Sequence, residues 1–264
     1  MNWNRFFDFR ELDDEPKPFL DHIEDLRWML VKMISVLVVM MGVSFAFQGT
    51  IVRFIQRPLT AINPEMMTNP TNFGIADPLS IAIELSFYSG IVLSFPFLIL
   101  FLAEFVLPAL NGKEKRMLYP AAGVSLGLFM GGAAFAYFIV LPSALDYFFN
   151  YSKSLGWNPQ WSVREYFSFV TQFVVSFGLA FELPLAVLIL VKLGILSHEV
   201  LVRTRAFAVI IILALAAIIT PTSDVFTLML MAGPMYLLYE GCIVIARFME
   251  RREKRSLVVP VEPE

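Results

Sequence analysis

One carboxylate of this sequence lies deep inside an apolar run, where ionisable groups are rare. Glu182 follows Ser176-Phe-Gly-Leu-Ala-Phe and precedes Pro184 by two residues. An acid inside a membrane span costs at least about 2.5–3.5 kcal/mol, and such acids commonly mark functional sites. Pro184 has no N–H for the carbonyl of residue 180, so it predicts a bend in this helix. Two interpretations remain open: a polar site on a concave, partly wet face, or an acid paired with a neighbouring helix for packing alone.

A second candidate for chemistry is Ser125, in the sequence Gly123-Val-Ser-Leu-Gly127. This fits the G-x-S-x-G pattern of serine hydrolases. A nucleophilic serine needs a base, usually histidine, and both histidines of the chain fall in segments outside the apolar runs. Gly123, Gly127 and Gly131 recur every four residues, as in stripes of small residues that let membrane helices approach. We therefore predict helix packing here rather than hydrolysis.

Metal and disulfide chemistry find little support. The one cysteine, Cys242, lies in an apolar run, so no disulfide can form within the chain. Zinc-protease, nucleotide and dinucleotide motifs are absent from the sequence. We expect no metal, no cofactor and no nucleic-acid partner, and the chain is not expected to be an enzyme.

The elements that must position these residues are membrane helices. The chain of 264 residues is 58% hydrophobic and 16% charged, whereas soluble proteins are nearer 45–50% apolar and 25% charged. A span needs roughly 20 apolar residues and must be helical to satisfy its backbone in lipid. The sequence therefore predicts an all-α polytopic membrane protein with six transmembrane helices, at about 28–47, 79–107, 118–141, 166–191, 206–219 and 225–246.

The distribution of lysine and arginine predicts the orientation. With six spans, 16 of the 20 basic residues fall on the side of the two termini. The other side carries only Arg53, Arg57, Lys153 and Arg164. The positive-inside rule therefore predicts that both termini are cytoplasmic.

This topology divides the chain into a cytoplasmic segment 1–27, a membrane domain 28–246 and a basic cytoplasmic tail 247–264, which we expect to be disordered. We expect two long outer loops, Gln48–Pro78 and Pro142–Glu165, and short charged inner loops. The fifth span is only about 21 Å long at 1.5 Å per residue. A span this short must thin the bilayer or lie beside water.

Several motifs follow one another along the chain from about Phe19 to Phe248: His22-Ile-Glu-Asp25-Leu26-Arg27, Gln56-Arg-Pro58-Leu59, Phe105-Val-Leu-Pro108-Ala-Leu110 with Lys113-Glu114-Lys-Arg116, Ala134-Phe-Ala-Tyr137-Phe with Leu141-Pro142, Phe181-Glu182-Leu-Pro184, Thr220-Pro221-Thr-Ser-Asp224, and Pro234-Met-Tyr236 with Glu240. Together they resemble the TatC family of twin-arginine protein translocase subunits. Each motif is weak by itself, and their joint register makes the resemblance specific.

The resemblance implies a cup-shaped receptor subunit in the bacterial inner membrane. Such a subunit binds twin-arginine signal peptides at the cytoplasmic face. It recruits TatA- and TatB-type single-span subunits, associates with itself, and moves folded proteins outward with the proton gradient. We expect the surrounding lipid bilayer to be its other partner.

The resemblance also assigns roles to residues of this sequence. It implies that Glu114 is the main contact for the arginine pair, with Phe105 beside it, Asp25 or Glu24 as a second acid, and Arg116 orienting Glu114. It implies a membrane-buried polar site and partner contact formed by Glu182, Gln172, Asp224, Tyr137 and Pro58. Guanidinium forks match carboxylates and stay charged at any cellular pH, so two acids at the inner surface suit two arginines.

The sequence departs from the family pattern in two ways that bear on this site. Asp25 stands where the family usually has Glu, with Glu24 alongside. Glu104 stands before Phe105 where an apolar or aromatic residue is more usual, and it would either add a third acid or disturb the apolar part of the site.

Two other functions remain as alternatives. A secondary transporter for a small solute would use Glu182 and the broken helix at Pro184 as a midplane site. A membrane-embedded hydrolase would use Ser125. Neither accounts for the series of motifs.

Overall fold

The computed structural model describes residues 19–62, 74–106, 112–220 and 224–257, with side chains for 22–62, 74–106, 120–220 and 224–251. This part of the chain is helical and contains no strand. Its elements are α1 (Phe19–Ala46), α2 (Gln48–Ile62), α4 (Asp77–Val106), α5 (Gly112–Phe135), the π-helical segment η3 (Ala136–Val140), α6 (Leu141–Ser154), α7 (Val163–Ala180), α8 (Leu183–Lys192), α9 (His198–Arg203), α10 (Arg205–Ile219) and α11 (Val225–Leu257). The predicted all-α class is confirmed.

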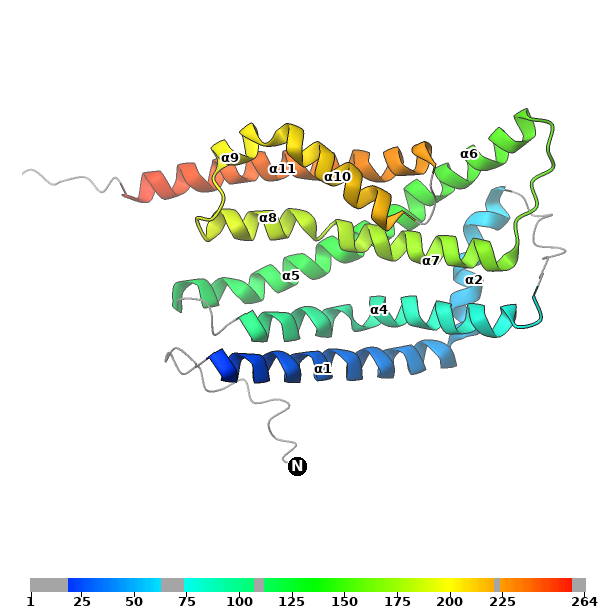
Figure 1. The fold of residues 1–264 in the computed structure, drawn as a ribbon, viewed down its shortest axis with the longest axis horizontal. Coiled ribbons are helices and arrows are strands. Elements are labelled where there is room, and N and C mark those ends of the chain that lie inside the picture. Colours follow the sequence, from blue (N-terminus) through cyan, green and yellow to red (C-terminus); the bar gives the residue numbers. More distant parts are fainter. Residues whose placement is uncertain (1–18, 63–73, 107–111, 221–223, 258–264) are drawn as a thin grey trace, which may run out of the picture.

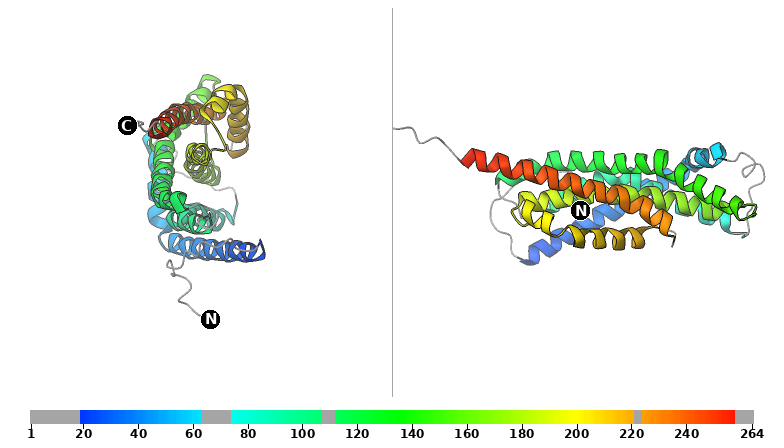
Figure 2. Two further views of the ribbon diagram at one scale, coloured as in Figure 1. Left: turned by 90° about the vertical axis from the view of Figure 1, so that its left-hand side faces the viewer. Right: turned by 90° about the horizontal axis from the view of Figure 1, so that it is seen from above.

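The long helices form one bundle, and successive long helices along the chain run in opposite directions (Figure 1). Helix α1 lies at one edge and packs along α4, while α10 and α11 pack together at the other edge (Figures 1 and 2). Five apolar stretches within the described helices are long enough to cross a membrane: His22–Ala46, Asp77–Val106, Pro120–Ser154, Val163–Lys192 and Val225–Arg251. The predicted fifth span corresponds to the shorter apolar helix α10, of 15 residues.

The prediction of an outer loop over Gln48–Pro78 is wrong for its first half, which forms α2. Ile51, Ile55 and Leu59 recur every four residues and give this helix an apolar face, of which Ile55 and Leu59 are buried. The helix lies across the ends of the spanning helices (Figure 1). Pro58 leaves the carbonyl of Phe54 without its helical donor, and the Tyr137 hydroxyl donates to that oxygen at 2.5 Å. A side chain from η3 thus replaces the bond that the proline removes.

The helix of the third predicted span continues beyond Leu141, into the first part of the predicted outer loop Pro142–Glu165. Helices α5, η3 and α6 form one unbroken helix from Gly112 to Ser154. The Leu141 N–H donates to the carbonyl of Ala136, five residues back, so the helix widens by one residue just before Pro142. A π-helical turn at this place lets the helix continue past the proline.

The chain after the sixth predicted span is helical as well. Helix α11 continues to Leu257, which contradicts the prediction of a disordered tail from residue 247 for that part. The predicted inner loop before α10 contains the short helix α9. The N–H of His198, the first residue of α9, donates to the Glu250 carboxylate of α11 at 2.6 Å. This bond attaches α9 to the extended end of α11.

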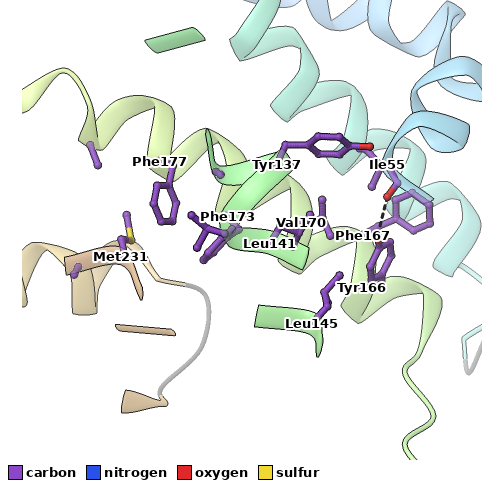
Figure 3. Packing of buried hydrophobic residues seen from close by; sticks show 14 of the residues in the cluster. Ile55, Tyr137, Leu141, Leu145, Tyr166, Phe167, Val170, Phe173, Phe177 and Met231 are labelled. Atoms are coloured by element: carbon purple, nitrogen blue, oxygen red, sulfur yellow. Dashed lines mark hydrogen bonds between the residues drawn. The ribbon is translucent and has the colours of Figure 1, made fainter. Parts of the chain in front are cut away.

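The core of the bundle is built around α7. Tyr166, Val170, Phe173 and Phe177 recur at intervals of three and four residues and are all at most 3% exposed. They pack against residues of η3, α6 and α11, including Leu141, Leu145 and Met231 (Figure 3). Since lipid chains are as apolar as these side chains, close packing rather than exclusion of water favours this association.

Two glycines allow α5 to approach α7 closely. A Cβ at Gly132 would lie 2.8 Å from the Phe177 carbonyl, and one at Gly178 would lie 2.7 Å from the Phe129 ring. The glycine stripe predicted from the sequence faces open space within the described part of the chain, since a Cβ at Gly123, Gly127 or Gly131 would meet nothing within 4 Å. Of the two packing glycines, Gly132 lies on a different face of α5 from that stripe, and Gly178 lies on α7.

Candidate functional site

Three helix ends meet at one end of the bundle and carry most of the predicted peptide-binding residues. Helix α1 begins there, α4 ends there and α5 begins there (Figure 1). We call this end, with Glu24, Asp25, Glu104 and Glu114, the acidic end. Glu114 lies in the first turn of α5. The side chains of Glu114 and Arg116 lie outside the described part of the structure, so only their helix is placed.

The α1 side of the acidic end is organised by an aromatic stack. The His22 imidazole lies on the ring of Phe105, with centroids 4.5 Å apart and an angle of 16° between the planes. This contact fixes the end of α4 against the second turn of α1, where Glu24 and Asp25 follow. The Glu24 carboxylate accepts from Arg27 at 2.9 Å in a well-exposed pair. The structure therefore places Phe105 against α1 at His22, two residues before Glu24.

A second ion pair, not foreseen in the sequence, joins α1 to α4 beside that stack. The Lys32 ammonium lies 3.3 Å and 3.2 Å from the two oxygens of Glu104, and 5.7 Å from the centroid of the Phe101 ring. Glu104 was recognised in the sequence as a departure from the family pattern. Its partner, Lys32, was not predicted, because the sequence does not reveal which residues of two antiparallel helices lie side by side.

Glu182 lies where α7 and α8 are interrupted. Helix α7 ends at Ala180 and α8 begins at Leu183, with Pro184 in its first turn, so the predicted bend is confirmed. The Ser125 hydroxyl of α5 donates to the Glu182 carboxylate at 2.7 Å. Ser125 is 2% exposed, and its partner is an acid rather than a histidine. This hydrogen bond agrees with a packing role for Glu182 as well as with a functional one.

Gln172 and Asp224 line one cavity, of about 530 Å³, near the end of the bundle opposite the acidic end. We call it the Gln172 cavity; its other lining residues include Phe148, Ser152, Trp161, Glu165 and Ser168. The Ser168 hydroxyl donates to Glu84 of α4 at 2.7 Å. Asp224 precedes α11 and accepts from the N–H of Thr227 at 2.7 Å, as a helix-capping aspartate does. The cavity combines apolar walls with several hydrogen-bonding groups.

The five residues predicted for the membrane-buried polar site and the partner contact therefore occupy three places. Glu182 pairs with Ser125, Gln172 and Asp224 share the Gln172 cavity, and Tyr137 and Pro58 meet where η3 joins α2. The sequence could not separate them, because residues distant along a helix differ in depth and in facing direction. Among the described residues, no three His, Cys, Asp or Glu side chains are grouped as a metal site would require.

Comparison with known proteins bears directly on this arrangement. The family model described as Sec-independent protein translocase protein (TatC) matches residues 21–234. A TatC of Carboxydothermus hydrogenoformans is 33% identical over 92% of this chain and 98% of its own length, and one of Aquifex aeolicus is 36% identical over 90% and 98%. A TatC of Akkermansia muciniphila is 48% identical over 69% of this chain, a match that spans 52% of that longer relative.

A solved structure has the same fold. The crystal structure of a twin-arginine translocase receptor, TatC, superposes with a TM-score of 0.76 at 35% identity, covering 86% of this chain and 98% of the other. The matches span the acidic end, the interruption at Glu182 and the Gln172 cavity. Proteins of this family are components of a translocase and pass through the membrane several times. The chain belongs to the TatC family of Sec-independent protein translocase proteins.

Proposed function

We propose that this chain is the receptor subunit of a twin-arginine translocase and that it binds the paired arginines of signal peptides at the acidic end. The observation that carries the proposal is the convergence of acids from three helices at that end. Glu24 and Asp25 of α1 and Glu104 of α4 lie beside the His22–Phe105 stack, and α5 begins nearby with Glu114. The TatC crystal structure named above is described as such a receptor.

The chemistry of the acidic end suits two neighbouring guanidinium groups. Arginine binds carboxylates through two parallel N–H···O bonds, which a lysine ammonium cannot form. Phe105 and His22 offer ring surfaces on which the side-chain stems, or a guanidinium plane, can lie. The site should therefore distinguish an arginine pair from a lysine pair, although both carry the same charge.

The proposed topology has six spans in a cup, both termini in the cytoplasm and the bacterial inner membrane as the location. The ends of the described helices support this orientation. Helix α1 begins and α11 ends at the same end of the bundle (Figure 1), together with the basic residues of α11. The four basic residues expected outside fall on α2, at the end of α6 and at the start of α7, which lie at the opposite end.

The Gln172 cavity and the interruption at Glu182 belong, in this proposal, to the side that receives the single-span TatA- and TatB-type partners. A partner helix with a polar side chain could hydrogen-bond to groups of the cavity at a depth where such bonds are otherwise unavailable. Assembly of these partners, self-association and the proton gradient would then complete the export of a folded protein. The transporter alternative would instead use Glu182 as a solute site, and it predicts solute uptake in the absence of any protein substrate.

The decisive experiment measures peptide binding to the full-length chain in nanodiscs. A fluorescent signal peptide with two arginines is titrated, and the same peptide with two lysines serves as the comparison. We expect tighter binding of the arginine peptide and a loss of at least about tenfold in Glu114→Gln, since removal of one partner of a close charge pair costs more than 1.4 kcal/mol. A photo-crosslinker at position 105 should capture the peptide.

Glu199→Gln is the matched control. Glu199 is an exposed acid at the same end of the bundle, but it lies on α9 rather than on α1, α4 or α5, and its replacement changes the net charge equally. It should leave the affinity within about twofold. Equal binding of the two peptides, or equal effects of the Glu114 and Glu199 variants, would refute the proposed arginine site.

A further inference from the structure

The Lys32–Glu104 pair lies in the contact between α1 and α4, and its two members differ in accessibility. The Lys32 side chain is 13% exposed, whereas that of Glu104 is 38% exposed. Lys32 follows His22 by ten residues, or roughly 15 Å along the helix. Its long side chain therefore extends back toward the acidic end, with the stem against Phe101, to place the ammonium at the carboxylate.

The geometry of the pair leaves Glu104 able to bind a second cation. Charge-assisted N–H···O bonds are usually about 2.7–2.9 Å long, and here one ammonium lies at 3.2 Å and 3.3 Å from the two oxygens. An ionised carboxylate offers about four acceptor positions, and a single ammonium cannot occupy all of them. The exposed part of Glu104 is therefore open to a cation that arrives from outside.

A role in packing alone explains the pair poorly. Replacing a partly buried ion pair with apolar residues of similar volume is often neutral or stabilising, so such a pair contributes little that two apolar residues would not. Glu104 is also adjacent in sequence to Phe105, whose ring fixes the acidic end against His22. The two residues lie in the same turn of α4 and both contact α1, Phe105 at His22 and Glu104 at Lys32.

We propose that Glu104 is a further contact for the arginine pair of the signal peptide and that Lys32 sets the affinity by competing for it. The inference rests on the proposed function. Glu104 attracts one guanidinium of the peptide, while the Lys32 ammonium competes for the same carboxylate. Lys32 is thus a specificity-determining residue that limits how tightly the peptide is held, which favours its later release.

The test uses the same peptide titration on the full-length chain. Lys32→Met keeps a stem that packs on Phe101 but removes the charge, and we expect it to tighten binding of the arginine peptide about three- to tenfold. Lys32→Arg should weaken binding, because a guanidinium holds Glu104 through both oxygens. Glu104→Gln should weaken binding by a similar factor, and the Lys32→Met change should have no effect in that background.

A merely structural pair predicts a different pattern. Lys32→Met and Glu104→Gln would then both weaken binding or both leave it unchanged, and either result overturns the inference. So would a tightening by Lys32→Met that persists when Glu104 is replaced. Lys192→Met, an exposed lysine at the end of α8, is the control for net charge and should change the affinity by less than twofold.

Failure of this inference is distinguishable from failure of the proposed function. If the wild-type chain prefers the arginine peptide and needs Glu114, but Lys32→Met does not tighten binding, only the competition between Lys32 and the peptide is refuted. If the wild-type chain shows no preference for the arginine peptide, the arginine site itself is refuted, and the role of Glu104 with it.

Discussion

Replacing Gly132 by alanine should destabilise the bundle, whereas the same change one residue earlier should not. A Cβ at Gly132 would lie 2.6 Å from a ring carbon of Phe181 and 2.8 Å from the Phe177 carbonyl oxygen. Ordinary contact begins at about 3.4 Å, so α5 and α7 would have to separate by about 0.6 Å at this point. The carbonyl belongs to a helix and cannot rotate away. Overpacking of this kind lowers the free energy of unfolding by about 1–3 kcal/mol. The higher helix propensity of alanine restores at most about 1 kcal/mol of this loss.

Gly131→Ala is the matched control, since a Cβ there would meet no described atom within 4 Å. We expect Gly131→Ala to be neutral or to stabilise the protein by up to about 1 kcal/mol. Unfolding of both variants in mixed micelles by increasing SDS, followed by far-UV circular dichroism, measures the difference in free energy of unfolding. Equal stabilities, or a greater loss at position 131, would refute the close approach of α5 and α7 at Gly132.

Three further changes test other contacts. Tyr166→Phe removes the hydroxyl that donates to the Ile55 carbonyl at 2.7 Å (Figure 3), and it should lower the free energy of unfolding by about 1 kcal/mol in the same SDS assay. Asp77→Ala should lower the unfolding temperature more than Arg164→Ala does, because the aspartate side chain is 11% exposed and that of its arginine partner, 3.2 Å away, is 56% exposed. Equal decreases in the unfolding temperature would contradict this. Pro184→Ala restores a backbone donor and should straighten the junction of α7 and α8, which spin labels at the two helix ends would record as a longer distance.

The helices of this protein were predictable from the sequence wherever length and apolar composition alone determine them. The run from 79 to 107 became α4, and the short run from 206 to 219 became α10, each within a few residues. Prolines at helix boundaries were misleading. Pro58 and Pro142 indicate chain breaks in the sequence, but in the structure a hydroxyl from another helix and a π-helical turn compensate for them. Such compensation depends on tertiary contacts and leaves no local signal.

Single features of the candidate site could be predicted from the sequence, whereas the contact partners of its residues could not. The interruption of the helix at Glu182 followed from Pro184 two residues later, whereas the stack of Phe105 on His22 of α1 was not predicted. The partner of Glu182, which is Ser125, was not predicted either. The polar type of Ser125 was visible in the sequence, but the face of α5 that meets α7 is decided by Gly132 and Gly178 rather than by the longer glycine stripe.

The unbroken helix from Gly112 to Ser154 connects the acidic end with the Gln172 cavity. At 1.5 Å per residue it is roughly 64 Å long, about twice the thickness of the hydrocarbon layer. Its first turn carries Glu114, and its last turns carry Phe148 and Ser152 of the Gln172 cavity. A tilt of roughly 10° about the midpoint would move the two tips by about 6 Å in opposite directions, by the geometry of a rod of this length. A change in the tilt of this one helix would therefore displace its first turn and the wall that it gives to the Gln172 cavity together.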